Sequence, residues 1–148
     1  DFMAGNRDLE AIGLCYPNYI GCFDSTFRIS RLKSDRNTYF THLKSFFISD
    51  AHWNREDLSG LKELNSIFIL PARQQYTNDP TGNPQIPIPA AVIDNIYIQV
   101  AAGAGQTVTG GVLTLYTAGT TRTSASDAAV SALLAKGWTL NLNGVQLH

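Results

Sequence analysis

The stretches Gly111-Val112-Leu113-Thr114-Leu115 and Gly137-Trp138-Thr139-Leu140-Asn141-Leu142 follow one pattern, in which a glycine leads into apolar residues at every second position. This period of two predicts a β-strand with one buried face. Between the two stretches, residues 124–135 carry apolar side chains at the spacing of one helix face: Val130, Leu133 and Leu134. A strand, a helix and a second strand of the same kind predict a repeated unit with parallel strands.

The helix predicted at residues 124–135 has its own start and stop signals. Ser124 or Ser126 is expected to cap its first turn, and Gly137 is expected to adopt the left-handed conformation that ends a helix. The closing strand then follows directly. Asn143-Gly144 is typical of a two-residue hairpin turn, so we expect the chain to fold back there and cap the sheet.

Upstream stretches match the same strand pattern, completely or in part: residues 9–14, residues 27–29, Leu43-Lys44-Ser45-Phe46-Phe47-Ile48 and Leu64-Asn65-Ser66-Ile67-Phe68-Ile69. The step from Phe27 to Phe46 is 19 residues, and the step from Phe46 to Ile67 is 21. Steps of about 20 residues between strands favour a repeat array. Before one of these strands, leucines recur at every third position and predict a tight helical or 3₁₀ turn: Leu58, Leu61 and Leu64.

Prolines and glycine interrupt the pattern between residues 71 and 89 and predict a loop with an extended exit. A helix that begins near Pro89 and ends at Gly103 would place three apolar residues on one face: Ile93, Ile96 and Val100. The β-branched residues at 93–98 leave a strand as the alternative. The alanines on both sides of this stretch favour the helix.

Composition and motifs exclude several functional classes. Charged residues make up 16% of the chain and the net charge is -1, so the clustered positive charge that nucleic acid requires is not expected. No run of about 20 apolar residues predicts a membrane span. The pairing of Cys15 and Cys22 is left open, and the histidines lack paired spacing with them, so neither a metal site nor a cofactor is predicted. The sequence also lacks the motifs of serine hydrolases, zinc proteases and P-loop enzymes, and we expect no enzymatic activity.

Residues 90–148 resemble the C-terminal part of leucine-rich repeat proteins, in particular those of Bacteroidetes bacteria and of the phages that infect them. The likeness rests on Lys136-Gly137-Trp138, placed after a helix and before an alternating strand, and on the strand at residues 111–116. It implies an α/β fold, an irregular leucine-rich-repeat solenoid with a parallel sheet and a C-terminal cap. Residues 1–89 would be degenerate leucine-rich repeats with a Pro/Gly-rich loop, and residues 90–148 a terminal helix–strand–helix–strand repeat and cap.

In such a solenoid, the residues between the apolar positions of the strands line the concave face. We expect this row to contain Arg28, Phe47, Phe68, Thr114 and Asn141. Phe47 and Phe68 are the candidates for stacking on a sugar ring or for anchoring a partner protein. The alternatives are that a loop or an adjoining subunit covers them, or that the register is shifted by one residue.

Trp53 is a second candidate for binding, because it lies in the most densely charged stretch of the chain, residues 50–57. Together with its charged neighbours it would bind a cation or a carbohydrate. The alternative is a solvated loop, since charged turn residues need no ligand to be stable.

The predicted function is that of a non-enzymatic extracellular or virion structural or binding module, in the first place a part of a phage tail or head appendage that contacts protein or a host surface. The first alternative is a bacterial cell-surface adhesin, a leucine-rich repeat domain that binds glycan or protein. The second alternative is a glycan-processing enzyme that uses the repeats as a scaffold. The expected partner is a protein or a surface glycan, and the expected location is extracellular, on a virion or on the bacterial cell surface.

Overall fold

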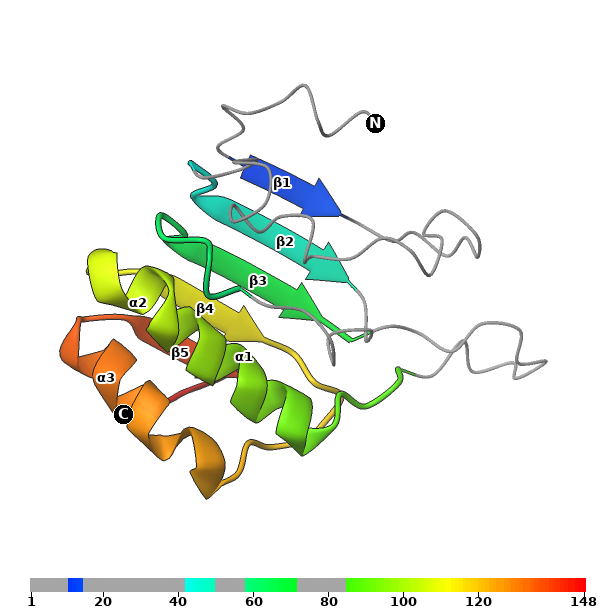
Figure 1. Cartoon of the computed structure of the whole chain (residues 1–148). Coiled ribbons are helices and arrows are strands. Elements are labelled where there is room, and N and C mark those ends of the chain that lie inside the picture. The colour runs from blue at the N-terminus through cyan, green and yellow to red at the C-terminus, as the bar shows by residue number, and fades with distance from the viewer. Residues whose placement is uncertain (1–10, 15–41, 50–57, 72–84) are drawn as a thin grey trace.

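The computed structural model describes residues 11–14, 42–49, 58–71 and 85–148. Its centre is a six-stranded sheet whose strands lie side by side in the order of the sequence (Figure 1). Five strands are parallel: β1 (Ala11–Leu14), β2 (Ser45–Ser49), β3 (Ser66–Leu70), β4 (Val112–Leu115) and β5 (Thr139–Leu142). The antiparallel β6 (Val145–Gln146) follows the predicted hairpin turn, in which Asn143 and Gly144 both have positive φ, 51° and 81°.

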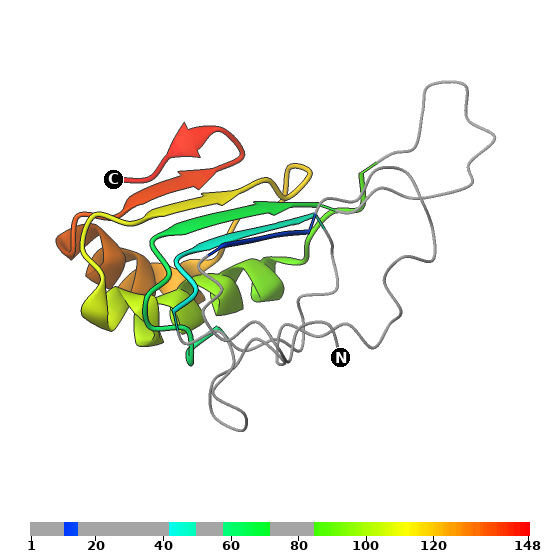
Figure 2. The same cartoon turned by 90° about the horizontal axis from the view of Figure 1, so that it is seen from above.

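The helices lie on one face of this sheet (Figure 2). They are α1 (Ala90–Ala102), the short α2 (Ala104–Thr107) and α3 (Asp127–Ala135), which is preceded by the 3₁₀ helix η3 (Ser124–Ser126). The chain is therefore an α/β protein with a parallel sheet, as the sequence pattern predicts.

The alternating pattern sets the register of the sheet. The pairing of Ile67 with Leu113, and of Leu113 with Leu140, aligns the first apolar position of β3, β4 and β5. These three side chains are at most 1% exposed. Burying a side chain of this size contributes about 1.5–3 kcal/mol, so a shift by one residue would turn a large apolar area toward water.

The predicted spacing of the strands holds for one step and fails for another. Phe46 of β2 pairs with Ile67 of β3, so the 21-residue step does join neighbouring strands. On its other side Phe46 pairs with Ile12 of β1. The predicted step from Phe27 is therefore wrong, because the direct pairing of β1 with β2 leaves no place for a strand between them. Residues 27–29 themselves lie outside the described residues.

Two elements cover the sheet beside β3 and β4. The predicted tight turn is present before β3, where Leu61 N donates to Leu58 O at 3.0 Å, and its three leucines are at most 1% exposed: Leu58, Leu61 and Leu64. The predicted helix is α1, and the three apolar residues of its predicted face are at most 3% exposed: Ile93, Ile96 and Val100. The alternative of a strand at residues 93–98 is wrong.

Gly103 ends α1 and lets the helix approach the turn before β3. A Cβ atom at this position would lie 2.9 Å from the carbonyl oxygen of Leu58, closer than real contacts allow. Beside it, Leu58 N donates to Oε1 of Gln99 at 2.7 Å. This contact explains why a glycine is needed there and fixes α1 over the sheet.

The terminal unit closes as its sequence predicts. Gly137 has a φ of +75° and donates from its backbone to Leu134 O at 2.9 Å, while Trp138 N donates to Leu133 O at 3.1 Å. These two bonds form a Schellman motif, which satisfies the last carbonyls of α3. The indole of Trp138 is 3% exposed, and its Nε1 donates to Val108 O at 3.0 Å.

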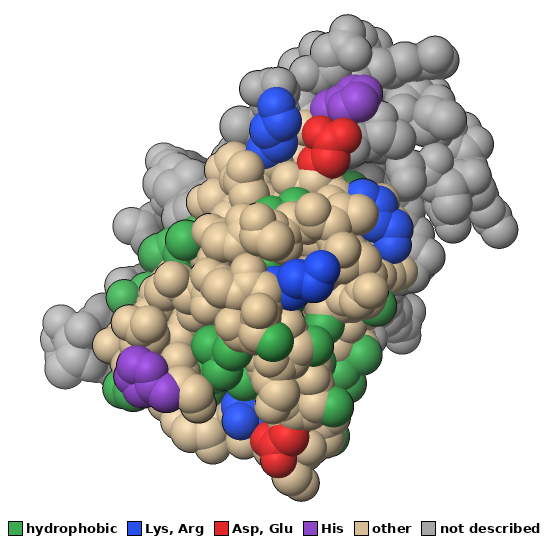
Figure 3. Space-filling view, turned by 90° about the vertical axis from the view of Figure 1, so that its left-hand side faces the viewer, with side chains coloured by type: hydrophobic (Ala, Val, Ile, Leu, Met, Phe, Trp, Pro, Cys, Tyr) green, Lys and Arg blue, Asp and Glu red, His purple; other side chains and the backbone are tan. Residues whose placement is uncertain are grey.

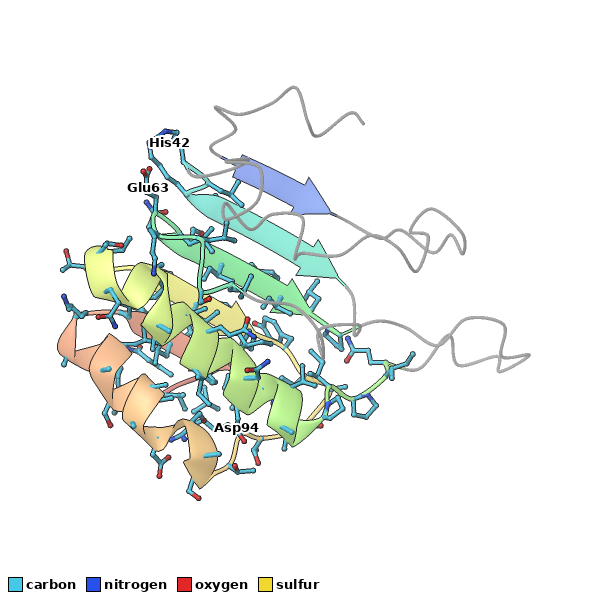
Figure 4. All side chains as sticks on the ribbon, viewed as in Figure 1. His42, Glu63 and Asp94 are labelled. Atoms are coloured by element: carbon cyan, nitrogen blue, oxygen red, sulfur yellow. The ribbon has the colours of Figure 1, made fainter. Side chains whose placement is uncertain are left out.

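Asp94 joins α1 to the start of α3 (Figure 4). Its side chain is buried and accepts hydrogen bonds from Thr123 N at 2.9 Å, Thr123 Oγ1 at 2.6 Å and Ser126 Oγ at 2.6 Å. The predicted cap by Ser124 or Ser126 is therefore wrong. Instead, the Thr123 hydroxyl accepts from Ala125 N at 3.2 Å, and the Ser126 hydroxyl donates to the Asp94 carboxylate.

Candidate binding face

The face of the sheet opposite the helices carries no helix in the described ranges (Figure 2). Its side chains come from alternate positions of β3, β4 and β5 and are exposed or half-buried, whereas the residues between them are buried. We call this surface the open face, made of Ser66, Phe68, Leu70, Val112, Thr114, Thr139 and Asn141. Since the helices pack on the other side, the open face is the part of the sheet that is left to contact solvent or a partner.

The register places the predicted binding row side by side across the sheet. Phe47 pairs with Phe68, Phe68 with Thr114, and Thr114 with Asn141. Asn141 Nδ2 also donates to Thr114 Oγ1 at 3.3 Å. Of Phe47 only the backbone position is described, and two further predicted site residues lie outside the described residues: Arg28 and Trp53. The role of the row in binding stays a prediction.

Tyr116 extends this face and was not among the predicted site residues. It lies one residue beyond β4, where Tyr116 N donates to Ile69 O at 2.9 Å and continues the pairing with β3. Its ring centroid is 5.8 Å from that of Phe68, with the two rings inclined by 51°. The sequence does hold the signal, because Tyr116 continues the alternation of Val112 and Thr114 by one more step.

A hollow of about 340 Å³ adjoins the ring of Tyr116. It is lined by Leu70, Gln85, Tyr116, Ala118, Gly119 and Asn143. Leu70 ends β3, and Tyr116 and Asn143 directly follow β4 and β5, so we call it the carboxyl-end hollow. None of its described lining residues carries a formal charge at neutral pH.

The wall of the carboxyl-end hollow is held by the side chain of Asn143. Its Oδ1 accepts from Thr117 N at 2.8 Å, and its Nδ2 donates to Thr117 Oγ1 at 2.8 Å and to Thr120 O at 3.0 Å. Thr117 is fully buried, and its carbonyl accepts from Ile88 N at 3.1 Å. The turn at residues 117–120 and the segment at residues 85–88 are therefore fixed to the end of β5. The sequence predicts the hairpin at Asn143, but not this use of its amide.

Charged side chains lie elsewhere on the described surface. His42 Nδ1 is 3.0 Å from Glu63 Oε1, and both side chains are exposed at the amino ends of β2 and β3 (Figure 4). Figure 3 draws this side of the molecule, where each acidic side chain lies beside a basic or histidine side chain, and mostly uncharged surface separates these groups. Among the described residues, no group of three or more His, Cys, Asp or Glu side chains is placed to hold a metal ion.

None of the helices within the described ranges is long and apolar enough to cross a membrane. Comparisons of the chain with protein families, with curated protein sequences and with solved structures find no match.

Proposed function

We propose that this protein is a non-enzymatic binding module of the leucine-rich-repeat type, which contacts its partner through the open face. The observation that carries the proposal is a sheet of five parallel strands that, within the described ranges, has helices on one side and an aromatic pair, Phe68 and Tyr116, on the other. All-parallel sheets normally have both faces covered. Aromatic side chains supply much of the energy at interfaces, because a large apolar area is buried with few rotatable bonds.

The order of the strands supports the repeat architecture. In doubly wound α/β folds, the strand order reverses at a switch point and helices cover both faces. Here β1 to β5 follow one another in sequence order, and equivalent positions of β3, β4 and β5 are aligned in rows. Repeat proteins stack in this way because each unit buries its apolar side chains against the next.

The chemical groups that line the carboxyl-end hollow support binding without catalysis. Among the described residues, the lining of the carboxyl-end hollow includes no carboxylate, histidine, cysteine or lysine, the groups most often used as general acids, bases or nucleophiles. Glycoside hydrolysis would need a pair of carboxyl groups about 5–10 Å apart, and the described lining supplies no carboxyl group. A surface of aromatic, hydroxyl and amide groups suits a protein or a glycan as partner.

We place this module outside the cell, in the first place as part of a phage tail or head appendage that contacts protein or a host surface. Charged residues make up only 16% of the chain, and this low fraction supports this placement. A bacterial cell-surface adhesin that binds glycan or protein is the second candidate. Immunogold electron microscopy of the natural source separates the two, because label on virion appendages supports the first and label on the bacterial envelope supports the second.

The test of the open face is a double substitution, Phe47→Ser with Phe68→Ser. On an array of bacterial surface polysaccharides and purified envelope proteins, we expect the wild-type chain to bind and the double variant to lose that binding. The free energy of unfolding should fall by only about 1 kcal/mol, since Phe68 is half-buried and is not among the core residues. Ile98→Ser is the matched control, because Ile98 is 42% exposed on α1, on the other side of the sheet. Unchanged binding by the double variant would contradict the proposal.

A further inference from the structure

We propose that the carboxyl-end hollow binds one or two rings of a neutral saccharide, with Tyr116 as the stacking platform. This inference rests on the proposed function and names a ligand class for one part of the same face. The carboxyl-end hollow, of about 340 Å³, lies at the small end of the range of roughly 300–1,000 Å³ that is usual for small-molecule sites. Its size therefore suits a short ring-shaped ligand.

The charge of the lining selects a neutral ligand. Anionic sugars such as uronic or sialic acids are recognised through Arg or Lys, which pair with the carboxylate. The described lining residues include neither of these, and they include no carboxylate that would attract a cationic sugar. A charged ring placed here would lose hydration without gaining a partner.

Two side chains of the carboxyl-end hollow match the two kinds of surface on a sugar ring. The ring of Tyr116 belongs to a residue that is 38% exposed, so it presents an apolar face to the C–H groups of a pyranose. Gln85 is exposed, and its amide offers both donors and an acceptor to neighbouring hydroxyl groups. The small residues Ala118 and Gly119, both with positive φ, leave room for the ring to approach the backbone.

The carboxyl-end hollow is preorganised for such a ligand. The amide of Asn143 is already bonded to Thr117 and Thr120, so it positions the turn and is not needed for contact. Ile88 N donates to Thr117 O and holds the segment that carries Gln85. A wall that is fixed before binding reduces the entropy lost on binding, which matters for weakly held sugars.

The position of the carboxyl-end hollow favours a sugar over an extended peptide. Peptides that bind to sheets add a strand to a free edge, where backbone groups are unpaired. The carboxyl-end hollow lies at the ends of β3, β4 and β5, and each of these strands is already paired on both sides. Recognition at this place must therefore use side-chain surfaces and the turn, as a ring-shaped ligand allows.

The experiment is a titration of the full-length chain followed by the amide NMR signals of Tyr116, Ala118 and Gly119. The probes are neutral oligosaccharides of glucose, galactose, mannose, fucose and N-acetylglucosamine, with oligogalacturonate of equal length as the anionic probe. Each is added to about 10 mM, above a Kd of about 1 mM, which is the weak end of specific binding. We expect at least one neutral probe to shift these signals in a saturable way, and oligogalacturonate to leave them in place.

Variants then connect the shifts to the stacking ring. Tyr116→Ala should weaken binding about tenfold or more, as loss of an aromatic contact predicts, and Tyr116→Phe, which keeps the ring, should weaken it less. Ile98→Ala, on the helix side, is the control and should bind as the wild type does. Equal losses for the Ala and Phe variants would overturn stacking on Tyr116, and preference for the anionic probe would overturn the choice of a neutral ligand.

Failure of this inference is distinguishable from failure of the proposed function. If no neutral probe shifts the signals, the inference is wrong. The proposed function still stands in that case if the array finds a ligand whose binding the Phe47→Ser and Phe68→Ser variant loses. If the array also finds no ligand that depends on these residues, both are wrong.

Discussion

Replacing Trp138 by alanine should lower the free energy of unfolding by about 3–5 kcal/mol. The indole is almost completely buried, and it donates from Nε1 to Val108 O. It also packs directly against Gly111, where an added Cβ atom would lie 2.7 Å from three atoms of the ring. The substitution would therefore leave a cavity beside Gly111 and an unpaired carbonyl at Val108.

Chemical denaturation followed by circular dichroism measures this loss. Val145→Ala is the matched control in the same terminal unit, because Val145 is 65% exposed and a surface change of this kind usually stays within about 0.5 kcal/mol. Gly111→Ala should also destabilise the protein, since the new methyl group would displace the ring. A midpoint for Trp138→Ala equal to that of the Val145 control would contradict the burial of the indole.

Replacing Asp94 by alanine is expected to lower the free energy of unfolding by about 2–4 kcal/mol at neutral pH. The substitution leaves three buried or half-buried donors without their acceptor: Thr123 N, Thr123 Oγ1 and Ser126 Oγ. Asp94→Asn keeps one acceptor oxygen and should lose less. The measurement is again chemical denaturation, with Ser131→Ala as the control, because Ser131 is exposed on α3.

The contribution of Asp94 should also depend on pH. Burial acts to raise the pKa of the Asp94 carboxyl, but the hydrogen bonds from Ser126 and Thr123 outweigh burial and lower the pKa below its ordinary value of 3.8. A carboxylate with a lowered pKa stabilises the fold above the unfolded pKa, and this stabilisation is lost as the pH falls through the folded pKa. The wild type and Asp94→Asn should therefore converge in stability below pH 3.8. A difference that stays constant from neutral pH into acid would mean that Asp94 is not ionised in the folded protein.

Local patterns predict most of the described strands because one face of the sheet is buried. The alternation at residues 64–69 and 111–115 fixes which side chains point inward, and the observed register follows it. Gly137 and Asn143-Gly144 are predictable for the same reason, since a positive φ limits the choice of residue. These features depend on neighbours within a few positions of the chain.

The features that the sequence did not predict depend on contacts between segments that lie far apart in the chain. The Ser126 hydroxyl reaches Asp94, which is 32 residues away, so the choice of Thr123 as the capping residue cannot be read from the local sequence. The same holds for the amide of Asn143, whose partners precede it by 23 and 26 residues. Spacing between similar strands is also insufficient, as the direct pairing of β1 with β2 demonstrates.

The candidate site was predictable in part. The row of Phe68, Thr114 and Asn141 follows from alternation alone, and the register brings these residues together. The predicted row takes one residue from each strand and therefore leaves out Tyr116, whose ring lies near that of Phe68. The carboxyl-end hollow was missed because its lining comes from four separate segments of the chain, which only the fold brings together.

The central claim, that the open face is the contact surface, is tested most directly by blocking each side of the sheet in turn. Thr114→Arg places a long side chain in the middle of the open face, and Ile98→Arg places the same side chain on the helix side. On the array of surface polysaccharides and envelope proteins, we expect Thr114→Arg to abolish binding while Ile98→Arg binds as the wild type does, with similar melting temperatures for both variants. Binding that survives Thr114→Arg but is lost with Ile98→Arg would contradict the claim.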